Sequence, residues 1–235
     1  MIPLERSRAT IIVGAGIAGL ACARRLAEAQ QPFLVVGDNV GGRIWRSRDG
    51  VVNLGAYFVR ADYHHVNRLV KRGRRIKALA ARCHDLYGSY TLWDRRLLLH
   101  LPQAARFLRH LFAFRRRYEA FKANAVVMSQ AQAIRADPYL WHLYHQPASD
   151  FIRQHRFGAI ARHYIAPALY GTAFQPLSRL TAFVLLLGAL PIVVPIFEFT
   201  LRSDAVRSDW SRNLLTDTVT GIALNRSGFI GDCFA

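Results

Sequence analysis

Three glycines near the start of the chain have the spacing of a phosphate-binding turn. Gly14, Gly16 and Gly19 fill the glycine positions of the pattern G-x-G-x-x-G. In this pattern the first glycine permits a tight turn, the second lets a pyrophosphate approach the backbone, and the third lets a helix pack closely on a strand. The free N–H groups and the dipole at the start of that helix attract the anion. The chemistry that this spacing predicts is the binding of a dinucleotide.

The residues on either side of the turn have the apolar patterns of a strand and a helix, which are the elements that must position it. A short apolar run ends at Val13, and from Ile17 the apolar residues recur at helical spacing. A second apolar run, Phe33–Val36, is typical of the next parallel strand. A glycine-rich turn without a ligand is the alternative explanation. The strand, turn and helix together favour an α/β fold of the Rossmann type.

Two further motifs follow the second apolar run. They are Gly41-Gly42-Arg43 and the run Asn-Leu-Gly-Ala-Tyr-Phe at 53–58. In this order the motifs resemble the FAD-dependent amine oxidase superfamily, which includes monoamine and polyamine oxidases, protoporphyrinogen oxidase and phytoene desaturases. The resemblance is specific over Ile11–Phe58 and looser from about 148 to 229. It implies an FAD domain with an interleaved, mostly helical substrate domain, and hydride transfer from a C–N or C–C bond of an apolar or amine substrate to the flavin.

The resemblance also implies which residues contact FAD. In that family an acidic residue closes the second strand and binds the adenosine ribose, but Gly37 stands there in this chain. Asp38 either takes that role from one position later or caps the following turn. Val219 matches a valine whose backbone contacts the adenine, and its segment is equally typical of a plain hairpin. The expected cofactor-binding residues are Gly14, Ala15, Gly16, Ile17, Ala18, Gly19, Asp38, Gly41, Gly42, Arg43, Gly55, Ala56 and Val219.

The composition indicates which binding partners the protein is expected to have and which kinds of site it is not expected to contain. The chain has 235 residues, is 52% hydrophobic and carries a net charge of +17, which favours anionic partners. No nucleic-acid motif accompanies this charge, so specific nucleic-acid binding is not expected. The three cysteines are far apart, which fits a reducing, cytoplasmic compartment and argues against a disulfide framework. His142 and His145 have no acidic third ligand nearby, so no metal site is expected.

The segment Arg60–Arg117 is strongly basic, with fifteen Lys and Arg against three Asp. Its residues Tyr90–Trp93 and Leu97–Leu99 predict a hairpin, and Pro102 predicts the start of an amphipathic helix. The expected apolar face is Ala104, Phe107, Leu108, Leu111, Phe114, Tyr118 and Phe121, and the expected polar face is Arg106, Arg109, His110, Arg116 and Arg117. The basic face is either ordinary solvated surface or a peripheral contact with an anionic membrane.

Further helices are expected in the second half of the chain. Ala125–Tyr144 is predicted to be partly helical with a break at Asp137-Pro138, and Pro147–His155 is predicted to be a short helix. Residues 180–197 carry no charge, so a membrane span has to be considered. Gly188, Pro191 and Pro195 interrupt that stretch. A buried helix over Leu177–Leu187, followed by an extended segment, is therefore favoured over a span.

These patterns predict three segments: a βαβ unit for FAD over 1–60, a mostly helical substrate-type domain over 61–200, and a return to the FAD domain over 201–235. The chain has about half the length of a full family member, and Gly231-Asp232 lies only three residues from its end. A truncated or split protein is therefore expected, with weak FAD binding by these residues alone. The alternatives are an NAD(P)-binding Rossmann protein, which Gly41-Gly42-Arg43 disfavours, and a non-catalytic remnant that binds membrane or a partner through its basic face.

Overall fold

The computed structural model describes residues 10–44, 55–56, 58–77, 82–85, 88–91, 95–202, 206, 209–225 and 228–233. They fall into two compact units. The first unit combines Met1–Ile76 with Ile196–Ala235, and the second unit is Lys77–Pro195. The chain therefore leaves the first unit and later returns to it.

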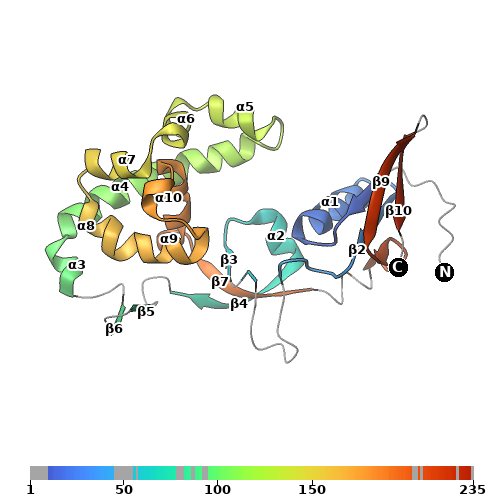
Figure 1. The fold of residues 1–235 in the computed structure, drawn as a ribbon, viewed down its shortest axis with the longest axis horizontal. Helices are drawn as coiled ribbons and strands as arrows, with labels where there is room; N and C mark the ends of the chain where they lie inside the picture. The colour runs from blue at the N-terminus through green and yellow to red at the C-terminus, as the bar shows by residue number, and fades with distance from the viewer. Residues whose placement is uncertain are drawn as a thin grey trace. The chain divides into compact units, whose positions relative to one another are not determined.

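A parallel sheet forms the base of the first unit. Its strand order is β1-β2-β8, with β1 at Thr10–Val13, β2 at Phe33–Gly37 and β8 at Leu214–Thr216. Helix α1 (Ile17–Glu28) connects β1 to β2, as Figure 1 shows. Ala23 of α1 packs in one buried cluster with Ile12, Phe33 and Val35. The predicted strand, turn, helix and parallel strand are confirmed, and with them the Rossmann-type α/β fold.

Two smaller antiparallel arrangements complete the first unit. One sheet has the order β3-β7-β4, with β3 at Val59–Arg60, β7 at Ile196–Leu201 and β4 at Val70–Ile76, and α2 (His64–Leu69) lies between β3 and β4 in the chain. The other arrangement is a hairpin of β9 (Val219–Asn225) and β10 (Gly228–Cys233). A hairpin, one of the two alternatives considered for the segment of Val219, is thus present.

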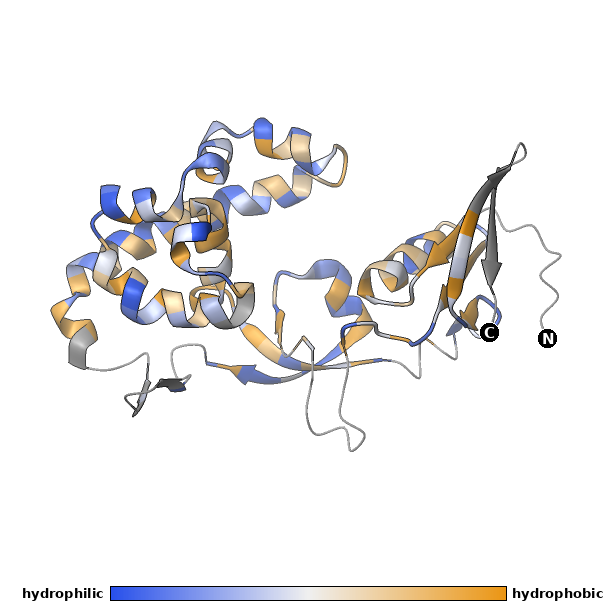
Figure 2. Ribbon diagram, viewed as in Figure 1, coloured by the Kyte–Doolittle hydropathy of each residue, from blue (hydrophilic) through white to orange (hydrophobic). Residues whose placement is uncertain are grey.

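The second unit is mostly helical. Its longest helix is α4 (Leu101–Asn124), whose side chains Phe107, Leu111 and Phe114 are buried. The Phe114 ring meets Phe183 of α10 edge to face, with 5.3 Å between the ring centroids. Figure 2 shows α10 as hydrophobic over most of its length. Further α-helices of this unit are α5 (Gln130–Arg135), α6 (Pro138–His145), α7 (Ala148–Gln154), α8 (Gly158–Ile160), α9 (Ala166–Ala173) and α10 (Ala182–Ala189).

Several helix boundaries follow from local chemistry. The break expected at Asp137-Pro138 is confirmed, because the Asp137 carboxylate accepts hydrogen bonds from the N–H groups of Tyr139 and Leu140 and caps α6. The helix expected over Leu177–Leu187 is wrong at both ends. Leu177–Arg179 forms a separate 3-10 turn, and the Thr181 side chain caps α10, which extends through Gly188. In the part of the chain that the structure describes, no helix has the length and hydropathy needed to cross a membrane.

The hairpin expected from Tyr90–Trp93 and Leu97–Leu99 is also wrong. Residues Arg95–Leu99 form the helix α3, and β6 (Gly88–Thr91) pairs with β5 (Arg82–Asp85). Arginine and leucine are good helix formers without β-branched side chains, so the run of arginines and leucines favours a helix over a strand.

Candidate dinucleotide-binding site

The glycine-rich turn lies between β1 and α1, where the motif requires it. Gly14 has a φ of +100°, a conformation that side chains rarely tolerate, and its N–H donates to the Val36 carbonyl at 2.6 Å. Gly16 is the N-cap of α1, and its carbonyl accepts from the Leu20 N–H. A Cβ atom added at Gly19 would collide with the Gly14 carbonyl oxygen. The turn therefore holds the helix directly against the strand, as expected for the third glycine of the motif.

The second glycine motif folds back onto this turn. The Gly41 N–H donates to the Ala15 carbonyl at 2.8 Å, and the Gly42 N–H donates to the Asn39 side-chain oxygen at 3.0 Å. A Cβ atom added at Gly42 would lie 3.0 Å from the Gly16 Cα. The two glycine motifs, which are separated by a helix and a strand in the sequence, thus form one backbone surface.

A third predicted segment joins this surface through Arg43. The Ala56 N–H donates to the Arg43 carbonyl at 3.2 Å, and a Cβ atom added at Gly55 would collide with the same carbonyl oxygen. The Arg43 side chain itself is exposed. The structure therefore connects the predicted residues at 41–43 with those at 55–56 through backbone contacts.

The end of β2 differs from the family pattern for a steric reason. A Cβ atom added at Gly37 would lie 2.6 Å from the Ala15 amide nitrogen, so no side chain fits at the position of the usual acid. Asp38 follows immediately and is exposed. Directly after the neighbouring strand β8, the Asp217 N–H donates to the Gly37 carbonyl at 3.2 Å, which ties the chain just before Val219 to the end of β2.

The start of α1 has the properties of an anion site. Its first turn contains no acidic residue, and its N-cap has no side-chain hydrogen bond. The first N–H groups of a helix lack intrahelical acceptors, so those of Ile17, Ala18 and Gly19 can point at a ligand. A Cβ atom at Gly16 would meet only the Gly42 Cα, at 3.8 Å. The residues present therefore leave a side-chain-free surface that fits a pyrophosphate.

Two asparagines support this site and were not identified from the sequence. Asn39 holds the Gly42 amide, and Asn213 donates from its side chain to the Phe33 carbonyl at 2.7 Å. The Asn213 carbonyl also accepts from the Val35 N–H, so this residue fastens β8 to β2. Asparagine before a Gly-Gly pair is typical of a turn, and that signal could have identified Asn39.

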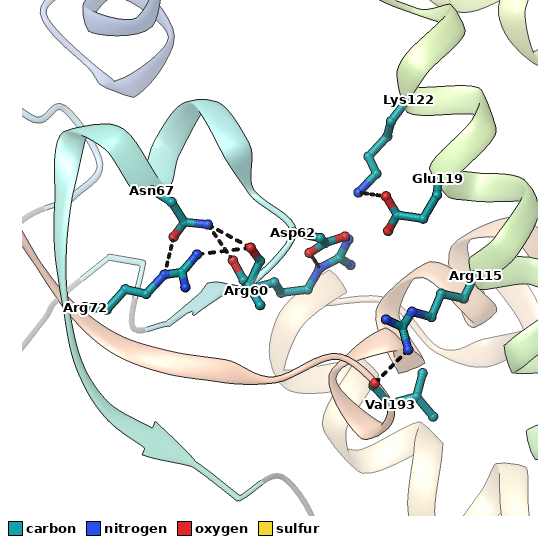
Figure 3. A network of polar contacts seen from close by, with 9 residues as sticks. Arg60, Asp62, Asn67, Arg72, Arg115, Glu119, Lys122 and Val193 are labelled. Carbon is teal, nitrogen blue, oxygen red and sulfur yellow. Dashed lines mark hydrogen bonds and ion pairs between the residues drawn. The ribbon is translucent and has the colours of Figure 1, made fainter.

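A buried arginine lies on β3, shortly after Gly55 and Ala56. Arg60 is 3% exposed and binds Asp62 in a bidentate ion pair, with N–O distances of 2.9 and 2.8 Å. Figure 3 shows the contacts beside it: the Asn67 amide donates to the Arg60 and Ala61 carbonyls and accepts from Arg72. This network fixes the connection between β3 and α2.

The histidines of α6 do not form a metal site. The His145 Nδ1 lies 2.9 Å from the Trp141 carbonyl oxygen, and the His145 ring packs beside the Trp141 ring. Within the described ranges, no group of three or more His, Cys, Asp or Glu side chains is placed to hold a metal ion.

Comparison with known proteins agrees with this geometry. Residues 12–72 match the family model of an NAD(P)-binding Rossmann-like domain, and this range contains both glycine motifs as well as Gly55 and Ala56. No curated protein gave a significant match.

Solved structures share the fold over nearly the whole chain. Wild-type putrescine oxidase bound to putrescine is similar over 96% of this chain and 54% of its own, with a TM-score of 0.62 and 19% identity. Cyclohexylamine oxidase from Brevibacterium oxydans IH-35A is similar over 97% and 55%, with a TM-score of 0.60 and 18% identity. A fatty acid isomerase from P. acnes that produces CLA is similar over 98% and 56%, with a TM-score of 0.62 and 14% identity.

The chain therefore spans about half the length of these proteins. At these identities the likeness shows a shared fold. The resemblance to amine oxidases that the sequence motifs indicated is confirmed at that level.

Proposed function

We propose that these residues form the FAD-binding half of a flavin-dependent oxidoreductase of the amine oxidase type. The observation that carries this proposal is the contact between the two glycine motifs. The Gly41 N–H binds the Ala15 carbonyl, and Gly42 lies against Gly16, directly beside the start of α1. A simple nicotinamide-binding domain has no use for a second Gly-Gly-Arg segment at this position.

Each part of the surface has a separate task in this proposal. The first N–H groups of α1 bind the pyrophosphate, and Gly16 lets it approach the backbone. Arg43 is exposed and adds positive charge beside the site. Asp38 is the nearest carboxylate after β2 and accepts a hydrogen bond from the ribose. Bound FAD supplies the two-electron oxidation of a C–N or C–C bond, and the chain positions it.

Binding of FAD by these 235 residues alone is expected to be weak. In the described part of the sheet, β1 pairs only with β2. Its side chains Ile11 and Val13 are 46% and 53% exposed, although the strands of a parallel sheet are normally covered on both faces. An incompletely covered sheet provides a less rigid support for the glycine-rich turn.

The test compares FAD and NAD titrations of the wild type with two variants. Gly16→Val places a side chain where the phosphate must approach, and its Cβ atom would make only an ordinary van der Waals contact with the Gly42 Cα, at 3.8 Å. It should lose at least tenfold in FAD affinity, measured by quenching of flavin fluorescence. The matched control is Gly158→Val in the second unit, where an added Cβ atom meets no neighbour within 4 Å.

A second candidate function is the binding of NAD(P), because the family model that matches residues 12–72 is described as NAD(P)-binding. Binding of NAD or NADP that Gly16→Val abolishes, without measurable binding of FAD, would support this candidate and refute the flavin proposal. Equal FAD affinity of the wild type and Gly16→Val would refute both.

A further inference from the structure

Helix α4 has a second, exposed stripe on the side away from its buried face. The residues of this outer stripe recur every three or four positions, so they lie on one face of the helix. They are Leu98, Leu101, Ala105, Arg109, Phe112, Arg116, Ala120 and Ala123, and all eight are exposed. Leu98 belongs to the preceding helix α3 and flanks the face that the other seven residues form on α4: the His100 N–H donates to the Leu97 carbonyl at the end of α3, and the His100 carbonyl accepts from the Ala104 N–H at the start of α4.

The outer stripe is unusual in its composition. Six of its eight residues are apolar, two are arginines and none is acidic. Its large apolar members Leu98, Leu101 and Phe112 are 66%, 52% and 53% exposed. In Figure 2 hydrophobic and hydrophilic residues are interspersed along α4. An exposed apolar stripe of this length, with only positive charge in it, is typical of a surface that is covered by something else.

The two arginines of the outer stripe differ from their neighbours on α4. Arg115 donates to the Val193 carbonyl at 3.3 Å, as Figure 3 shows, and Arg106 donates to the Arg156 carbonyl at 2.9 Å. Arg117 pairs with Asp137 at 3.1 Å. Among the residues that the structure describes, neither Arg109 nor Arg116 forms a hydrogen bond or ion pair. The positive charge available for a partner therefore lies within the apolar stripe.

Exposed apolar residues also lie at both ends of the stripe. Leu99 is 79% exposed at the start of the stripe, and Val126 and Val127, which follow α4, are 72% and 82% exposed. At 1.5 Å per residue, the 24 residues of α4 span roughly 36 Å between these ends. The apolar surface thus extends over a length that a small ligand could not cover.

We propose that the outer stripe docks the protein on an anionic lipid surface, with α4 lying parallel to the membrane. Leucine and phenylalanine side chains enter the boundary between headgroups and acyl chains, while arginines keep their charged ends at the headgroups. A second copy of the chain fits less well, because its own stripe offers no acidic residue to pair with Arg109 and Arg116. The net charge of +17 also favours an anionic partner. This inference does not depend on the bound dinucleotide.

The test is co-sedimentation with vesicles that contain 30% phosphatidylserine in phosphatidylcholine, at low salt. The wild type should bind these vesicles and not pure phosphatidylcholine, and added salt should weaken the binding by screening. The double variant Arg109→Glu with Arg116→Glu, and separately Phe112→Asp, should each bind at least tenfold more weakly. Because all three side chains are exposed, circular dichroism and the melting temperature should remain unchanged.

The matched controls change equal charge and equal apolar area elsewhere on the second unit. Arg162→Glu with Arg179→Glu reverses two other exposed arginines, and Phe174→Asp removes a phenylalanine that is 77% exposed. Both controls should stay within about twofold of the wild type. Equal losses in the controls, absence of binding to anionic vesicles, or a vesicle-independent dimer that the stripe variants dissociate would each overturn the proposal.

Discussion

Gly37 and Ala15 lie so close together that the end of β2 has no room for a side chain. A Cβ atom at residue 37 would be 2.6 Å from the Ala15 amide nitrogen and 3.1 Å from the Ala15 Cβ. The strand that usually ends in an acidic residue therefore ends here in direct contact between two backbones. Any ribose contact has to come from a later residue.

The first prediction follows from this contact. Gly37→Glu restores the family's acidic residue in the sequence but should destabilise the protein, because the sheet end and the glycine turn must separate. Overpacking of this kind costs about 1–3 kcal/mol. The urea midpoint should fall for Gly37→Glu and change little for Gly221→Glu, where an added Cβ atom meets no neighbour. An unchanged midpoint for Gly37→Glu would contradict the close contact.

A companion variant tests whether Asp38 binds the ribose or only caps the turn that follows β2. The side chain is exposed, so Asp38→Asn should leave the stability unchanged. If the carboxylate binds the ribose, FAD affinity should fall about tenfold or more, as expected for loss of a hydrogen bond to a charged group. Unchanged affinity would leave Asp38 with the role of a turn residue.

The second prediction concerns the buried ion pair of Arg60 and Asp62. Their side chains are 4% and 11% exposed, so Asp62→Ala leaves a guanidinium buried without its carboxylate. The expected loss of unfolding free energy is about 3 kcal/mol or more. The control is Glu198→Ala, which removes the exposed pair with Arg74 on the same sheet and should cost less than about 1 kcal/mol. Similar losses in the two variants would contradict the burial of Arg60.

The third prediction concerns acid sensitivity of the second unit. The rings of His110 and His155 lie 4.0 Å apart between centroids, beside Phe151. Burial, then the charges of His155 and Arg109, lower the pKa of His110 from 6.5 to about 4. Burial and Arg109 lower the pKa of His155 as well. Because the unfolded chain binds these protons more readily, stability present above pH 6.5 should be lost as the pH falls toward 4.

The measurement is the melting temperature between pH 7.5 and 4. After allowance for solvent exposure, the expected loss is about 1–2 kcal/mol. His110→Leu should flatten the curve between pH 6.5 and 4, whereas His163→Leu, at an exposed position, should follow the wild type. Parallel curves for the wild type and His110→Leu would show that this pair does not control the acid response.

The sequence predicted the elements that depend on local patterns. The strand ending at Val13 and the helix from Ile17 follow from short-range periodicity, and the break at Asp137-Pro138 follows from local turn chemistry. The contact between Gly41 and Ala15 could be anticipated only through the resemblance to a family, because no local rule brings these residues together. The lack of space for a side chain at Gly37 is visible only in the three-dimensional structure.

Other features of the fold could not be predicted, because the local sequence was ambiguous or the side chain binds a residue far away in the chain. The sequence predicts a strand at Leu97–Leu99, where the structure has a helix. An apolar run of that length does not distinguish a strand from a helix. The sequence places Arg106 on the expected polar face of α4 and Arg115 on neither face, yet both side chains bind carbonyl groups of the second unit. Phe112 was not included in either face of α4, although its exposure completes the outer stripe. Helical spacing alone does not show which of two apolar stripes is buried.

The way the chain leaves and re-enters the first unit has a consequence for its folding and engineering. Ile76 and Ile196 are directly opposite each other on β4 and β7. Cα atoms of such cross-strand partners are about 5 Å apart, a gap that a two-residue hairpin turn closes. The second unit is therefore inserted between two paired strands, and joining residue 76 to residue 196 through Asn-Gly should turn β4 and β7 into a continuous hairpin. During synthesis, conversely, β4 is made long before its partner strand, so this sheet is completed only after the inserted unit has been translated.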